Sequence, residues 1–231
     1  MKGKSITVVM ATMISIVPPL CAQNAEHLRY FLAYRECQRC ELSKIDVSGT
    51  DLRGAFLEGA NLSMSRLSNV NLFNAEMTDV DLRMSTLQDA NLRNSVLVGA
   101  DLLSANLVNA NIRNSRLKYA NMARARMDNA NLMEAELVYA NLSQAELPKA
   151  NLRNSSLYRA KLVGANLEGA DLYRANLEEA DLRGANLQNA DLSLANLSNA
   201  NLDGANLKGA NLCNATLPSG ELSKQGCPLG G

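Results

Sequence analysis

The sequence predicts an all-β solenoid in which the chain winds into a four-sided coil, with one five-residue repeat on each side. Three observations predict this fold. Apolar residues recur at every fifth position, a small residue precedes each of them by two positions, and a longer motif recurs at multiples of four repeats. A short helix is expected ahead of the coil, and an export signal ahead of that helix.

The five-residue period runs from residue 42 to residue 217 without an insertion. Every residue in this span whose number ends in 2 or 7 is apolar, and nearly all of them are leucine. The substitutes are Val47, Met77, Ile112, Met122 and Met127. On an α-helix, five residues advance about 500°, so successive leucines would lie about 140° apart and form no face. On a strand, every fifth residue changes face. The chain must therefore turn a corner every five residues, which returns each leucine to the interior.

The longer motif sets the number of corners in one coil. Leu92-Arg93-Asn94-Ser95 recurs at 112–115, with isoleucine in the first place, and unchanged at 152–155. Successive copies are four and then eight pentads apart, which predicts four sides of five residues each. The small slot, with numbers ending in 0 or 5, is mostly alanine. Leucine and alanine should therefore fill each layer, because a larger residue in the small slot would overpack it.

The Ala-[Asp/Asn]-Leu-x-x repeats resemble those of the pentapeptide repeat family, and they cover residues 42–217. The resemblance implies a right-handed quadrilateral parallel β-helix. Similar members that carry an export signal, mostly from cyanobacteria, have a Cys-x-x-Cys just ahead of the repeats and a cysteine loop after them. Cys37 and Cys40 match the first feature here, and Cys213 and Cys227 match the second. The resemblance therefore implies a periplasmic or thylakoid-lumen address.

Residues 1–22 are typical of a signal peptide. Lys2 and Lys4 precede an apolar run at 6–17, and Ala22 is a small residue at a cleavage position. The run of about a dozen residues is shorter than the roughly 18–20 that span a bilayer. We therefore expect export to the periplasm, the thylakoid lumen or the extracellular space, with no stable membrane anchor after cleavage. An uncleaved anchor and a lipoprotein lipidated at Cys21 are the alternatives.

The remaining chain divides into an N-terminal helical cap with the Cys-x-x-Cys (23–41), the repeat coil (42–217), and a C-terminal cap and tail (218–231). A helix is expected at 24–36, with Asn24 as its N-cap. Leu28, Phe31 and Leu32 should lie on the side of this helix that seals the first coil. Because both ends are covered in this scheme, a monomer is expected.

The four cysteines outside the signal predict two structural disulfides, Cys37–Cys40 and Cys213–Cys227, in an oxidising compartment. A thioredoxin-type redox site and reduced buried thiols are the alternatives. The redox site is disfavoured because it needs Cys-x-x-Cys at a strand-to-helix junction, whereas here a helix precedes it. A zinc site is not expected because the two pairs should lie at opposite ends of the rod.

No catalytic residues, cofactor or metal site are predicted. His27 is the single histidine, which excludes sites built from several histidines. A convex rod offers no cleft for a substrate. The 23 basic residues balance the 23 acidic ones, so no nucleic-acid binding is expected.

One side of the coil carries a candidate interaction patch. Stacking equivalent positions of successive coils should place aliphatic, aromatic and cationic side chains in two neighbouring columns, a composition typical of protein interfaces. These residues are Val98, Lys118, Val138 and Tyr158 in one column and Tyr119, Tyr139 and Arg159 in the next. The alternative is that valine and tyrosine are there only because they suit an exposed sheet.

The leading functional hypothesis is a non-catalytic, rod-like scaffold or protein-interaction module that binds another protein outside the cytoplasm. One alternative is a DNA-mimic inhibitor of DNA gyrase, as in the fluoroquinolone-resistance branch of the family. The export signal and the zero net charge disfavour it. A second alternative is a thiol–disulfide redox protein that uses Cys37 and Cys40.

Overall fold

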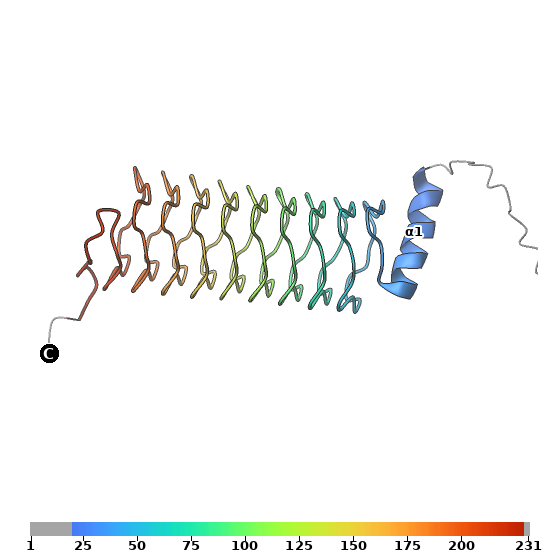
Figure 1. Ribbon diagram of the computed structural model, residues 1–231, viewed down its shortest axis with the longest axis horizontal. Helices are drawn as coiled ribbons and strands as arrows, with labels where there is room; N and C mark the ends of the chain where they lie inside the picture. Colours follow the sequence, from blue (N-terminus) through green and yellow to red (C-terminus); the bar gives the residue numbers. More distant parts are fainter. Residues whose placement is uncertain (1–19, 229–231) are drawn as a thin grey trace, which may run out of the picture.

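The computed structural model describes residues 20–228, which form one helix, α1 (Leu20–Tyr34), followed by a regular coil (Figure 1). Parallel β-bridges join equivalent positions of successive coils, from the pair Glu36 and Phe56 to the pair Asn196 and Thr216. The predicted return of the chain onto itself after every four pentads is therefore confirmed. Each side contributes a single bridged residue per coil, so the described chain contains isolated bridges instead of longer strands. α1 and the C-terminal segment lie at opposite ends of the stack (Figure 1).

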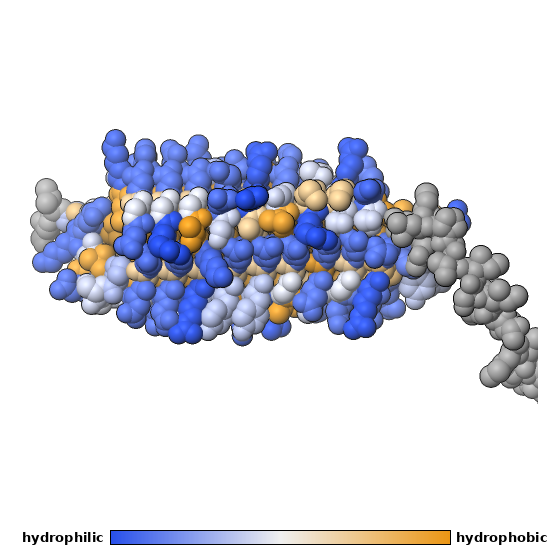
Figure 2. Space-filling view, turned by 90° about the horizontal axis from the view of Figure 1, so that it is seen from above, coloured by the Kyte–Doolittle hydropathy of each residue, from blue (hydrophilic) through white to orange (hydrophobic). Residues whose placement is uncertain are grey.

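The leucine positions line the interior, as the five-residue period predicts. From Leu57 to Leu197, every residue numbered with a final 2 or 7 is at most 1% exposed. The alanines of the small slot, with numbers ending in 0 or 5, are buried to the same degree from Ala55 to Ala195. Burying one leucine side chain stabilises a fold by about 1.5–3 kcal/mol before chain entropy is counted. The core is therefore a continuous column of leucine and alanine, with hydrophilic side chains in rows outside it (Figure 2).

Serine can replace alanine in the small slot because its hydroxyl finds a partner there. The Oγ of Ser85 donates to the Leu82 carbonyl at 2.6 Å, and the Oγ of Ser155 donates to the Leu152 carbonyl at 2.7 Å. Each acceptor is the leucine three residues earlier, at the start of the same corner. A buried hydroxyl that is hydrogen-bonded costs little, so these serines fit the core without breaking the period.

Each corner is a four-residue turn with one residue in the left-handed region. At one such corner the Ala140 N–H donates to the Leu137 carbonyl at 3.0 Å, and Tyr139 between them has φ 59°. Glycine adopts this conformation without steric penalty, as Gly184 does at φ 63°. Most corners carry another residue, most often asparagine, which tolerates positive φ better than other side chains do.

The asparagine that precedes the leucine in the repeat serves both the turn and the stack. The Asn61 Oδ1 accepts the Ser63 N–H at 3.0 Å, which fixes the start of the corner. The Asn141 Nδ2 donates to Asn121 Oδ1 at 3.1 Å, which joins neighbouring coils. Aspartate can take the first role, although it cannot donate to the stack. The Asp/Asn position of the motif therefore follows from two hydrogen bonds.

The coil begins earlier than residue 42, the predicted boundary. Its first bridge involves Glu36, and Cys37 occupies a leucine position at 2% exposure. Cys40 takes the following small slot and is partly buried against the same core. In the first pentad, Cys37 thus takes the place of leucine and Cys40 takes the place of alanine. The five-residue period of leucines therefore does not include this pentad.

The helix also differs from its prediction. α1 starts at Leu20, so Asn24 lies inside the helix, and the prediction of Asn24 as N-cap is wrong. The stretch from Leu20 to Asn24 contains neither glycine nor proline, so nothing in it stops the helix from starting a turn earlier. The predicted cleavage position after Ala22 falls in the first turn of α1, and the rest of the predicted signal, 1–19, lies outside the described residues.

α1 packs on the first coil through one narrow stripe. Phe31 is completely buried in the core cluster and Leu28 is partly buried against it. Leu32 is 48% exposed, so its predicted contact with the coil is wrong. Leu28 and Phe31 lie on the side of α1 that faces the coil. Leu32 is one residue further along and is therefore turned by about 100° from Phe31, toward solvent.

We expect Leu132→Ala to lower the free energy of unfolding by about 2–5 kcal/mol, because Leu132 is fully buried and the coil on each side is already packed. The matched control is Leu194→Ala, at a corner where the side chain is 42% exposed. It should change the free energy by less than about 0.5 kcal/mol. Urea unfolding followed by circular dichroism measures both, and equal losses would contradict the inward orientation of the leucine positions.

Candidate functional site

The residues of the predicted patch lie on successive coils of one side, and we call them the tyrosine patch. They are Val98, Lys118, Tyr119, Val138, Tyr139, Tyr158 and Arg159. Backbone hydrogen bonds fix the register between these coils. The Tyr119 N–H donates to the Val138 carbonyl at 3.1 Å, and the Tyr139 N–H donates to the Tyr158 carbonyl at 3.0 Å. Val98 and Val138 are partly exposed, and Lys118 is exposed.

Three tyrosine rings form a continuous aromatic column. The Tyr119 and Tyr139 rings stack with centroids 5.4 Å apart and an interplanar angle of 17°. The Tyr139 and Tyr158 rings meet edge to face, with centroids 5.9 Å apart. Tyr119 is 56% exposed and Tyr139 38% exposed. The rings therefore hold one another in place while much of the surface of Tyr119 and Tyr139 stays open to solvent.

Cations and one carboxylate surround the column. The Lys118 Nζ lies 4.9 Å from the centroid of the Tyr119 ring. The Arg159 Nε donates to Glu179 Oε2 at 2.6 Å, and its Nη1 donates to the Tyr139 hydroxyl at 3.1 Å. The Tyr158 hydroxyl donates to Glu179 Oε1 at 3.1 Å. Glu179 was missed by the sequence prediction, although it lies in the same column, one coil after Arg159.

These contacts shift the pKa values of the groups they join. The hydrogen bond from Arg159 lowers the pKa of the Glu179 carboxyl. Burial, and next the hydrogen bond to Glu179, raise the pKa of the Tyr158 hydroxyl. Arg159 is held in its charged form, its pKa raised first by Glu179 and then by Tyr139. All three groups therefore keep one ionisation state around neutral pH.

Tyr119, Tyr139 and Arg159 all occupy corner positions with positive φ, at 62°, 59° and 54°. A bulky residue costs about 1–2 kcal/mol in this conformation relative to glycine. Asparagine or glycine fills most of the corners elsewhere in the coil. Other large side chains, such as Met64, Arg124 and Leu194, also stand at corners with positive φ, so this conformation is a general property of the coil.

A second group of aromatic and cationic side chains lies on another side of the coil and was not predicted. The Arg153 guanidinium lies 4.2 Å from the Tyr173 ring centroid, and that of Arg174 lies 5.1 Å from it. Arg153 also pairs with Asp171 at 3.0 Å. This group could have been predicted from the sequence, because Arg93, Arg113 and Arg153 lie in the same column of stacked positions as Tyr173.

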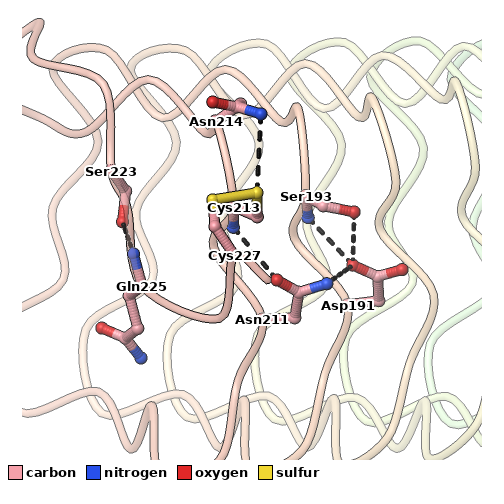
Figure 3. The surroundings of a disulfide bond; sticks show 8 residues. All are labelled: Asp191, Ser193, Asn211, Cys213, Asn214, Ser223, Gln225 and Cys227. Atoms are coloured by element: carbon pink, nitrogen blue, oxygen red, sulfur yellow. Dashed lines mark hydrogen bonds between the residues drawn. A yellow bond between two sulfur atoms is a disulfide. The ribbon is translucent and has the colours of Figure 1, made fainter. Parts of the chain in front are cut away.

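Both predicted disulfides are present. Cys37–Cys40 has its Cα atoms 5.3 Å apart, and Cys213–Cys227 has them 4.7 Å apart. Figure 3 shows that Cys213 lies on the coil, where its N–H donates to Asn211 Oδ1 at 3.1 Å. Closing a loop of this length, with a sequence separation of 14, stabilises a fold by about 3 kcal/mol in the chain-entropy model. This bond therefore ties the C-terminal segment to the last coil.

His27 has a structural contact. Its Nδ1 accepts the Glu41 N–H at 3.2 Å, in the place where an earlier coil would supply a carbonyl. Within residues 20–228, no three His, Cys, Asp or Glu side chains group as metal ligands. No helix in that same span has the length and apolar character needed to cross a bilayer.

A family model described as Pentapeptide repeats matches the chain in eight copies. Together the matches cover residues 40–223. The chain belongs to the pentapeptide repeat family. Members of this family are generally structural or interaction proteins.

Solved structures of other pentapeptide repeat proteins resemble this one. HetL from Nostoc sp. strain PCC 7120, involved in heterocyst differentiation regulation, is 33% identical over 86% of this chain and 98% of its own, with a TM-score of 0.37. Full-length QnrB1, a plasmid-mediated fluoroquinolone resistance protein, is 14% identical over 77% of this chain and 84% of its own, with a TM-score of 0.56. The QnrB1 likeness shows the fold alone.

A pentapeptide repeat protein from the Arabidopsis thaliana thylakoid lumen is 35% identical. The similarity covers 40% of this chain and 65% of that protein, with a TM-score of 0.22. A search of curated proteins found no match.

We expect Tyr119→Asn to leave the stability of this pentapeptide repeat protein within about 1 kcal/mol of the wild type. The variant loses one stacked ring pair, which contributes about 0.5–1.5 kcal/mol, and gains a residue that tolerates positive φ. Denaturant unfolding measures the difference. A loss of several kcal/mol would show that the Tyr119 ring is needed for the fold.

We expect the Glu179 carboxyl to titrate below its ordinary range because Arg159 stabilises its charged form. The contribution of this pair to stability is then fully present above the ordinary glutamate pKa and is lost as the pH falls through the lowered value. Carboxyl-carbon NMR of Glu179 measures the midpoint. In an Arg159→Gln variant the midpoint should rise toward about 4.3, and an unchanged midpoint would contradict the assignment.

Proposed function

We propose that this protein is an exported, non-catalytic, rod-like interaction module whose tyrosine patch binds another protein. The observation that carries this proposal is the aromatic column formed by Tyr119, Tyr139 and Tyr158, half open to solvent and bordered by Lys118 and Arg159. Rigid aromatic and arginine side chains supply much of the binding energy at protein interfaces.

The geometry of the tyrosine patch favours the binding of a partner protein over catalysis. Hydrogen bonds join Glu179 to both Arg159 and Tyr158. These bonds restrict the side-chain conformations around the tyrosine rings. A partner that meets a preorganised surface loses less side-chain entropy on binding. The coil behind the patch is packed throughout, so the rings keep their spacing when a partner arrives.

We propose that the protein acts in the periplasm or the thylakoid lumen. Two disulfides suit an oxidising compartment, and they sit at both ends of the repeats, as in the exported members that the sequence resembles. We also propose that the coil winds in the right-handed sense, as the family resemblance implies, and that α1 caps the first coil. The buried Phe31 supports the cap.

Two alternatives are less well supported. Inhibition of DNA gyrase by DNA mimicry needs an acidic rod, whereas this chain has zero net charge. A redox function of the Cys37–Cys40 disulfide needs a sulfur that is open to attack, whereas Cys37 is 2% exposed and Cys40 is partly buried against the core.

We expect the triple variant Tyr119→Ser, Tyr139→Ser and Tyr158→Ser to lose its partner by at least tenfold in cross-linking and quantitative mass spectrometry from the native compartment. The matched control replaces Tyr30 and Tyr34 in α1, an exposed ring pair at 4.8 Å, with serine. The control should retain the partner. If the triple variant captures the same proteins in the same amounts as the wild type, the patch is not the binding surface.

A further inference from the structure

Corner side chains of successive coils can share a hydrogen bond along the rod. The Asn109 Nδ2 donates to Asp89 Oδ1 at 2.9 Å, and the Asn114 Nδ2 donates to Asn94 Oδ1 at 3.0 Å. In both pairs the donor lies one coil after the acceptor in the same column. A corner side chain that carries an acceptor is therefore paired when the next corner of its column supplies a donor.

Asp79 and Asp89 are the two aspartates with positive φ in the described chain, and their surroundings differ. One coil after Asp89 stands Asn109, which donates to it. One coil after Asp79 stands Gly99, which has no side chain. A Cβ atom at residue 99 would overlap Asp79 Oδ1, so the carboxylate leans into the place of the missing side chain. Among residues 20–228, no hydrogen bond or ion pair joins the Asp79 carboxylate.

The ring of Tyr119 borders the same place from the other side, because Tyr119 follows Gly99 by one coil in the corner column. Tyr139 stacks on one face of this ring, with centroids 5.4 Å apart, so the other face is turned toward Gly99. The Lys118 Nζ lies 4.9 Å from the ring centroid, which shows that the ring attracts a cation. We call the place of the missing side chain, between Asp79 and Tyr119, the Gly99 gap.

An arginine held by both a tyrosine ring and a carboxylate is a recurring arrangement on this rod. The Arg153 guanidinium lies 4.2 Å from the Tyr173 ring centroid and 3.0 Å from Asp171 Oδ2. Arg159 likewise lies over a tyrosine ring, at 5.1 Å from its centroid, and donates to Glu179 at 2.6 Å. The Gly99 gap has a ring and a carboxylate of the same kinds, but no arginine of the described chain lies between them.

Charge on this side of the coil favours a cation at the Gly99 gap. The two coils before Gly99 carry three acidic residues on this side and no lysine or arginine. The three are Glu58, Glu76 and Asp79, and none of them forms an ion pair within the part of the chain that the structure describes. A cationic group that approaches the gap therefore meets uncompensated negative charge.

We propose that the Gly99 gap binds an arginine side chain of the partner protein, an inference that rests on the proposed function of the tyrosine patch. The guanidinium would stack on the open face of Tyr119 and donate N–H groups to the Asp79 carboxylate. Asp79 and Tyr119 are two coils apart, or about 9–10 Å along the axis. Contact with the ring takes about 3.5–4 Å and a hydrogen bond to a carboxylate oxygen about 2.9 Å, so one planar group fits between them.

Arginine suits this place better than lysine does. A guanidinium is planar, so it can face the ring and at the same time present a fork of N–H groups to the carboxylate, whereas an ammonium is a point charge. The methylene groups of the arginine would lie on Val98, which is next to Gly99 in the chain and is partly exposed. The site therefore selects for shape as well as for charge.

The direct test titrates acetyl-arginine methylamide into the full chain and follows the Gly99 N–H and the Tyr119 ring signals by NMR. Acetyl-citrulline methylamide is the matched probe, because it has nearly the same shape without the charge. We expect the arginine probe to shift both signals and to bind with a Kd at least fivefold below that of the citrulline probe. Equal affinities, or no shift of either signal, would overturn the site.

A Gly99→Asn variant tests the gap itself. Asparagine tolerates positive φ and would donate to Asp79 as Asn109 donates to Asp89, so the Kd of the arginine probe should rise at least fivefold. The matched control is Gly164→Asn, at a corner with φ 65° on another side of the coil, and it should leave the Kd unchanged. If Gly99→Asn binds the probe as the wild type does, the proposal is wrong.

Two further variants test the chemistry of the site. Asp79→Asn keeps the size of the side chain and removes its charge, so the Kd of the arginine probe should rise at least threefold. Lys118→Met removes the cation nearest the ring, which repels the guanidinium and competes with it, so the Kd should fall at least twofold. A Kd that fails to move in the stated direction in either variant would contradict an arginine at this place.

Partner capture from the native compartment separates this inference from the proposed function. The triple tyrosine variant tests the patch and Gly99→Asn tests the gap, and we expect each to lose the partner at least fivefold. If the triple variant loses the partner and Gly99→Asn keeps it, the patch stands and the arginine contact is wrong. If both variants keep the partner, the proposed function is wrong, and the gap is not part of the interface.

Discussion

The stacking of each coil on the next by backbone hydrogen bonds is the constraint on which the rest of this structure depends. Each donor meets its acceptor at a fixed offset along the chain, as Leu182 meets Asn201 and Asn201 meets Ala180, so every coil must have the same length. The period of the leucines, the small slot and the left-handed corners all follow from keeping that length constant. A side chain that suits one pentad must suit its neighbours above and below. Stability is therefore a sum over adjacent coils more than a property of one central core.

This constraint also explains why so much could be predicted from the sequence. The coil of four pentads, the buried leucine positions and both disulfide pairings were predicted and are present. The errors lie where the repeat no longer governs the chain. The start of α1 at Leu20 depends on local helix propensity, and the first pentad carries Cys37 in place of leucine. The contacts of Glu179 with Arg159 and Tyr158 depend on side-chain conformation, which the register alone does not determine.

The tyrosine patch shows how a regular framework can display an irregular surface. The backbone of the coil is nearly the same at every corner, so it places no demand for tyrosine at 119 or 139. Those residues add ring stacking to the surface and strain to the backbone. The framework tolerates the strain because the leucines beneath, such as Leu117 and Leu137, are fully buried. A site of this kind can change by substitution at the surface while the interior stays constant.

The four-sided coil also sets the angular relation between surfaces along the rod. An insertion of one pentad ahead of Val96 would keep every later leucine inside, yet it would rotate the tyrosine patch by a quarter turn relative to α1. An insertion of four pentads would preserve the bearing of the patch and move it one coil, or about 4.8 Å, further along the axis. Length and orientation are thus independent variables in this architecture. A partner that contacts the rod at two places can therefore distinguish relatives in which the number of pentads between those places differs by anything other than a multiple of four.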